Sequence, residues 1–93
     1  MAMVVGPTLE IHAAIIEEAK TTEHQRYQAE KYEINRRWDA VAADLDSARM
    51  VGYLSPHERT VMRTFITSNR SIDHTRCSMG HCMRMLDIQT VSK

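Results

Sequence analysis

The chain has 93 residues, of which 43% are hydrophobic, 26% charged and only 5% aromatic, and its formal net charge is zero. This length allows one domain at most, and the composition is not that of a disordered chain. A zero net charge argues against a strongly electrostatic binder of nucleic acid or membrane.

Targeting signals and cysteine spacing predict a cytoplasmic location. The segment Met1–Gly6 lacks the basic start of a secretory signal, and no apolar run approaches the roughly 20 residues that span a bilayer. On a helix, Cys77 and Cys82 would lie about 8–9 Å apart at their α-carbons, beyond the roughly 7 Å that a disulfide bridges. We therefore expect reduced thiols and no membrane partner.

The first half of the chain predicts one long helix. Residues 1–7 read as a flexible tail, and residues 8–93 as a single helical domain with a helix at 8–51, a turn at 51–55 and a helix at 56–88. Thr8 is suited to cap the first helix. The polar stretch 20–31 is either a break near residues 20–22 or a solvated part of a continuous helix. Beyond its start, the expected packing seam of this helix consists of Tyr27, Ile34, Trp38, Val41, Leu45 and Ala48.

The start of the first helix is apolar over a wider arc than one neighbouring helix would cover. Either this end contacts a second copy or another protein, or the C-terminal residues Ile88 and Val91 fold over it. The candidate partner-binding residues are Leu9, Ile11, Ile15, Ile16 and Ala19.

The second helix has a marked beginning. Ser55 and Glu58 form a capping box, and Pro56 takes the first helical position, where its missing N–H is not needed. A seam of alternating three- and four-residue spacings follows, made of Val61, Phe65, Ser68, Ile72, Thr75, Met79, Cys82 and Leu86. Antiparallel folding about the short turn would bring Trp38 near Ser68 and Ile72, and Tyr27 near Met79. Gly80 is a point where the helix bends or ends.

The two halves of the chain carry opposite net charges, which cancel in the sum. Up to Ser55 the chain holds six basic and nine acidic residues, a net charge of −3, and the remainder carries +3. Either the two helices attract one another, or the second helix presents a basic face. In the latter case the candidate nucleic-acid contacts are Arg63, Arg70 and Arg84.

One cluster of reactive side chains stands out, with His74, Cys77 and His81 on one predicted face, and Cys82 beside them. These are zinc ligands by type, but His74 and His81 lie about 10.5 Å apart along a helix, too far for one ion. A histidine beside Cys77 could instead lower the pKa of its thiol for nucleophilic chemistry. No third catalytic group, phosphate-binding loop or protease signature accompanies them, so we expect no enzyme, no bound metal and no cofactor.

Leu54–Arg63 is similar to the opening helix of the helix-turn-helix domain of bacterial response regulators. In that family a glycine-containing turn and a recognition helix follow, and residues 67–72 would take their place here. No glycine marks this turn, and the DNA-reading residues have no clear counterparts. The resemblance implies a small DNA-binding regulator as the alternative function.

The sequence therefore predicts an all-α protein, an antiparallel hairpin of two long helices that assembles into a multi-helix bundle as a homo-oligomer. The expected function is non-catalytic protein–protein binding, as an adaptor, an assembly factor or an inhibitor of a larger protein. Inhibitors encoded by bacterial viruses are one class of this kind.

Overall fold

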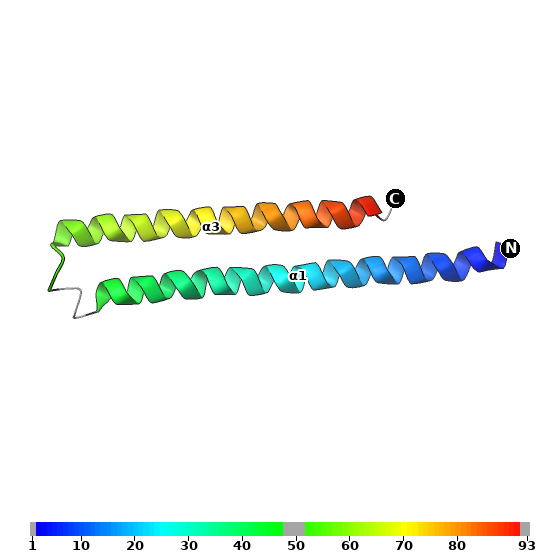
Figure 1. Ribbon diagram of the computed structural model, residues 1–93, viewed down its shortest axis with the longest axis horizontal. Coiled ribbons are helices and arrows are strands. Elements are labelled where there is room, and N and C mark those ends of the chain that lie inside the picture. Colours follow the sequence, from blue (N-terminus) through cyan, green and yellow to red (C-terminus); the bar gives the residue numbers. More distant parts are fainter. Residues whose placement is uncertain (1, 48–51, 92–93) are drawn as a thin grey trace.

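In the computed structural model the chain is a helical hairpin. Helix α1 (Ala2–Asp46) and helix α3 (Pro56–Val91) run antiparallel and side by side (Figure 1). The structure describes residues 2–47 and 52–91, with side chains for 10–47 and 52–90. The predicted all-α hairpin is confirmed, and assembly into a bundle stays a prediction.

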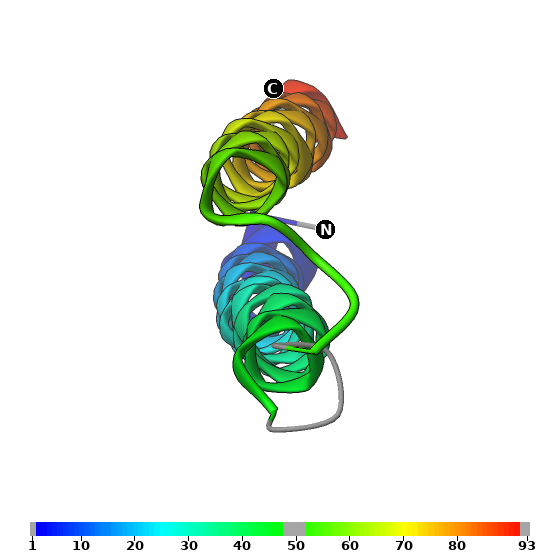
Figure 2. The same ribbon diagram turned by 90° about the vertical axis from the view of Figure 1, so that its left-hand side faces the viewer.

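The hairpin is long and thin. Its α-carbons extend over 77 × 18 × 9 Å, and the view along the helices shows α3 stacked on α1 (Figure 2). The buried hydrophobic side chains of the described residues are Ile16, Ile34, Leu45, Ile66 and Cys77, and no large side chain is fully enclosed. Two helices alone therefore form only a narrow core.

The start of α3 agrees with the predicted capping box. The Ser55 amide donates to Glu58 Oε1, and the Glu58 amide donates to Ser55 Oγ, both at 3.1 Å. These bonds satisfy two amides at a helix end that has no intrahelical partners for them. They also hold the pKa of Glu58 below its ordinary value, chiefly through the Ser55 amide.

Helix α1 corrects two expectations. It begins at Ala2, so residues 2–7 are helical where a tail was predicted. Pro7 is the sixth residue of this helix, and its missing N–H removes one intrahelical hydrogen bond there. The helix also continues without a break through residues 20–22, and it ends at Asp46; the predicted end at residue 51 lies outside the described residues.

The predicted register of the two helices agrees with the structure, but the predicted face of α3 is wrong. Trp38 Nε1 donates to Asp73 Oδ2 at 2.7 Å, and the Tyr27 hydroxyl bonds Ser78 Oγ at 2.8 Å. Asp73 follows the predicted Ile72 and Ser78 precedes the predicted Met79, so the two partners flank the predicted seam on opposite sides, and α1 lies against the side of α3 opposite that seam. All eight residues of the predicted α3 seam are exposed. The apolar stripe of α3 is therefore on its exposed side, and α1 lies against a more polar face.

Helix α3 is continuous through residues 67–72, so the turn that a helix-turn-helix domain requires is absent there. It also continues past Gly80 to Val91, three residues beyond the predicted end. A Cβ at position 80 would lie 3.2 Å from Arg84 Nη1, so this glycine makes room for the Arg84 side chain. Within the described residues, neither helix has an apolar stretch long enough to cross a bilayer.

Candidate protein-binding surface at the open end of the hairpin

The N-terminal end of α1 projects beyond α3 (Figure 1). Glu23 is bonded to Arg84, and seven more residues take α3 to Val91 and α1 back to Ile16. Residues 2–15, the overhang of α1, therefore extend past the end of α3. Its last residue, Ile15, still lies beside Ile88 of α3, and α1 continues from there toward Ala2 without α3 next to it.

The predicted partner-binding residues divide into two groups. Ile11 and Ile15 are 62% and 57% exposed, whereas Ile16 is buried and Ala19 is half-buried. The side chain of Leu9 lies outside the described residues. Ile88 lies beside Ile15 and Ala19, as the alternative of a covering C-terminus requires, but it leaves both isoleucines of the overhang more than half exposed. The side chain of Val91 is likewise outside the described residues.

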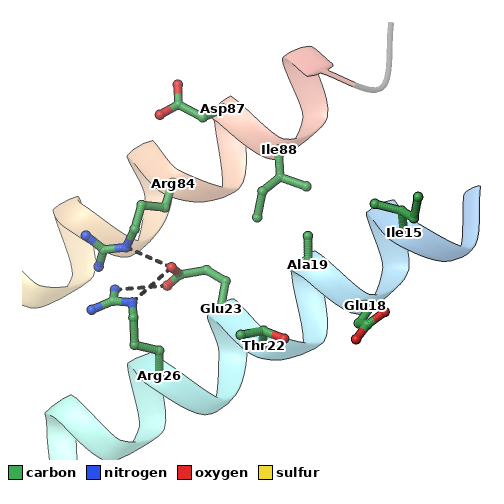
Figure 3. Close-up of a pocket in the computed structure, with 9 residues that line it drawn as sticks. All are labelled: Ile15, Glu18, Ala19, Thr22, Glu23, Arg26, Arg84, Asp87 and Ile88. Carbon is green, nitrogen blue, oxygen red and sulfur yellow. Dashed lines mark hydrogen bonds and ion pairs between the residues drawn. The ribbon is translucent and has the colours of Figure 1, made fainter. Parts of the chain in front are cut away.

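An open groove of about 590 Å³ continues from the overhang between the two helices (Figure 3). Its apolar part is formed by Ile15, Ala19 and Ile88, which point toward the space between α1 and α3 (Figure 3). The groove ends at a cluster of charged side chains around Glu23. The remaining lining residues are Glu18, Thr22, Glu23, Arg26, Arg84 and Asp87.

Glu23 is the centre of the polar contact between the helices and is only 6% exposed. Its carboxylate accepts hydrogen bonds from Arg26 at 3.0 and 3.1 Å, from His81 Nδ1 at 2.8 Å and from Arg84 Nε at 2.8 Å. The Arg26 bonds, and after them the His81 bond, hold the pKa of Glu23 below its ordinary value against the opposing effect of burial. A buried charge with this many partners fixes the two helices relative to one another.

Aromatic rings extend this cluster along α1. The rings of Tyr27 and His81 stack with centroids 4.1 Å apart and planes 6° from parallel, and the centroid of the tilted His24 ring lies 5.2 Å from that of His81. The Lys31 ammonium group sits 4.3 Å from the Tyr27 ring centroid. The polar stretch 20–31 is therefore neither a break nor merely solvated, because it supplies much of the contact with α3.

The histidines and cysteine that suggested metal or thiol chemistry are engaged with α1. Cys77 Sγ donates to Glu30 Oε2 at 3.0 Å, and His74 Nε2 lies 2.8 Å from Asn35 Oδ1. Burial, with a smaller contribution from Glu30, raises the pKa of the Cys77 thiol to about 11, opposite to the lowering that a nucleophile needs. Among the described residues no three histidine, cysteine or acidic side chains are grouped as a metal site would require.

The predicted basic face is paired with acids of α1. Arg63 contacts Asp46, Arg70 Nη2 lies 2.8 Å from Asp39 Oδ1, and Arg84 is bonded to Glu23. Arg59 also reaches Asp46, at 3.4 Å. The opposite charges of the two halves of the chain thus meet across the hairpin, as the first of the two readings of the charge pattern expected.

Sequence reasoning missed the Glu23 cluster, although a signal for it was present. Glu23, Arg26 and Glu30 of α1 fall three and four positions apart, and His81 and Arg84 of α3 fall three apart. In an antiparallel pair these two runs lie opposite one another.

The comparisons with known proteins add nothing to this geometry: no family model matches the chain, and neither the curated proteins nor the solved structures give a significant match.

Proposed function

We propose that this chain is a small non-catalytic helical protein that acts by binding another protein through the overhang of α1 and the adjoining groove. The observation that carries the proposal is the exposure of Ile11 and Ile15, 62% and 57%, at the end of α1 that extends past α3. An adaptor, an assembly factor or an inhibitor of a larger protein would use such a surface. A cytoplasmic location, where the Cys77 thiol stays reduced, belongs to the same proposal.

The side chains of the overhang and the groove indicate what kind of partner would be complementary to them. Burying an isoleucine side chain contributes about 1.5–3 kcal/mol, so the two exposed isoleucines are suited to anchor an amphipathic helix or an apolar ridge. The exposed acids Glu18 and Asp87 border the groove, while its arginines, Arg26 and Arg84, are already bonded to Glu23. A complementary partner therefore presents apolar side chains flanked by basic ones.

The arginines of α3 give less support to DNA binding. Arg63, Arg70 and Arg84 each have an acidic partner on α1, and phosphate contacts would have to replace those partners. If DNA binding were the function, affinity would fall steeply with salt concentration and would require Arg63 and Arg70.

A capture experiment with matched variants tests the proposal. The full chain, Ile15→Asp and Gln28→Asp are used as baits in an extract of the source cell, and captured proteins are identified by mass spectrometry. Gln28 is exposed in the middle of α1, so its variant adds the same charge away from the overhang. We expect a protein captured by the native chain and by Gln28→Asp but not by Ile15→Asp, with the helical circular dichroism signal unchanged. Equal capture by all three baits, or salt-sensitive capture of nucleic acid alone, would refute the proposal.

A further inference from the structure

The predicted seam of α3 is an apolar surface without a partner in the hairpin. We name it the outer stripe: Val61, Phe65, Ser68, Ile72, Thr75, Met79, Cys82 and Leu86. All eight residues are exposed, Phe65 at 55% and Met79 at 61%. Successive residues of a helix are rotated by about 100°, which places the outer stripe on the side of α3 directly opposite Ile66, Cys77 and the other residues that face α1.

The side chains in and around the outer stripe are those of a helix contact and not of a solvated face. The stripe itself has no charged residue. Two rows of side chains border the stripe: those one position before Phe65, Ile72, Met79 and Leu86, and those one position after Val61, Ser68, Thr75 and Cys82. In these two rows only Arg76 is charged. The outward face of α1 is different, because it carries charged and amide side chains such as Gln25 and Arg36.

The alternation of large and small side chains along the outer stripe favours an identical helix, in antiparallel orientation, as its binding partner. Phe65, Ile72, Met79 and Leu86 occupy one set of heptad positions and are large, whereas Val61, Ser68, Thr75 and Cys82 occupy the other set and are smaller. In an antiparallel pair of identical helices, each layer combines a residue of one set with a residue of the other. In a parallel pair, large residues would meet large ones and small residues would meet small ones, so that overfilled layers alternate with empty ones.

We infer that the outer stripe binds a second copy of this chain, with the two α3 helices antiparallel about a two-fold axis that passes between Asp73 and His74. In this register Phe65 faces Cys82 of the second copy and Met79 faces Ser68. The central layers pair Ile72 with Thr75, and the outermost layers pair Leu86 with Val61. Shifting the register by a heptad in either direction loses two of the eight layers, so the two-fold arrangement buries the most apolar surface.

The hairpin accepts this pairing without rearrangement, since α1 occupies the opposite side of α3. The outer stripe is about 38 Å long on a helix about 10 Å wide, a projected area on the order of 400 Å² per copy. This is at the small end of specific interfaces, for which we expect a Kd on the order of 10 µM. The dimer leaves the overhang of α1 free, so the inference does not depend on the proposed function.

The molar mass in solution tests the inference. Light scattering from about 1 to about 500 µM should give a mass that rises toward twice the 10.7 kDa of one chain. Ile72→Asp puts two carboxylates into the central layers and should weaken the dimer by about 100-fold or more. Thr67→Asp, at an exposed position on the side of α3, and Ile15→Asp should leave the mass unchanged. A native chain that stays monomeric throughout, or a dimer that Ile15→Asp but not Ile72→Asp dissociates, would overturn the inference.

Orientation is tested by the variant Phe65→Cys, which places a thiol opposite the native Cys82 of the second copy. Mild oxidation should give a covalent dimer joined by disulfides between positions 65 and 82, identified by peptide mapping. Phe65→Ser is the control and should not form that species. Disulfides that join 65 to 65 or 82 to 82 would show a parallel pair and contradict the proposed arrangement.

Discussion

Replacing Glu23 by glutamine tests the polar contact that holds the hairpin together. The substitution keeps the size of the side chain and removes the charge to which Arg26, His81 and Arg84 are bonded. Two of these groups are on α3, so the change acts directly between the helices.

The structure sets the expected loss of stability. Removing one partner of a fully buried charge pair costs about 3–5 kcal/mol, and a hydrogen bond to a charged group contributes about 1.5–3 kcal/mol. The partner arginines Arg26 and Arg84 are 37% and 41% exposed, so water replaces part of what the carboxylate supplied. We therefore expect the free energy of unfolding to fall by about 2 kcal/mol.

Thermal unfolding followed by circular dichroism measures this loss. At fixed protein concentration, Tm should fall by about 8–16 °C for a chain of this size. Glu33→Gln is the matched control, because Glu33 is paired with Arg36 on the surface of the same helix and its removal should change Tm little. If the two variants lowered Tm equally, the Glu23 cluster would not stabilise the hairpin in the way argued.

Three further outcomes follow from the same contacts. The pKa values of Glu23 and Glu30 lie below the ordinary 4.5, through hydrogen bonds from an arginine on the same helix and from Cys77, respectively. The stabilisation that these two carboxylates contribute is present above pH 4.5 and is lost as pH falls through their lowered pKa values. The urea midpoint of unfolding should therefore drop in that acidic range, and it should drop less steeply for Glu23→Gln. A urea midpoint that does not change with pH in this range would contradict the prediction. Cys77, which is buried and has a pKa of about 11, should resist alkylation by iodoacetamide at neutral pH. In a chain whose outer stripe is disrupted, the exposed Cys82 should react. Equal alkylation rates of the two cysteines in peptide mass spectra would be evidence against the described burial of Cys77. Ser55→Ala should lower the free energy of unfolding by about 1 kcal/mol through loss of the α3 cap, and an unchanged urea midpoint would argue against the capping box.

Local sequence signals predicted those parts of the fold that depend on local interactions. The start of α3 could be predicted because Ser55, Pro56 and Glu58 interact only with their own helix end. The short turn predicted at residues 51–55 then required antiparallel helices and fixed their register, which is why Tyr27 and Trp38 were expected within one residue of their observed partners.

The face that α3 turns to α1 could not be predicted from apolar spacing. A heptad pattern such as that of Phe65, Ile72 and Met79 indicates that a helix packs against another one, but does not say whether that helix belongs to the same chain. The observed contact is held instead by charged and aromatic groups, among them Glu23 and His81, whose preference for one another appears only when both helices are considered together. The candidate surface at Ile11 and Ile15 was predicted, because an apolar arc wider than one neighbour can cover is visible in a single helix.

The measurement that tests this account most directly asks which face of α3 meets α1. Nuclear Overhauser effects from the Tyr27 ring can be recorded on the Ile72→Asp chain, in which the outer stripe is disrupted. The account predicts contacts between the Tyr27 and His81 rings, whose centroids lie 4.1 Å apart. Contacts from Tyr27 to Met79 in their place would put the outer stripe inside the hairpin, and would contradict both the polar contact and the proposed dimer.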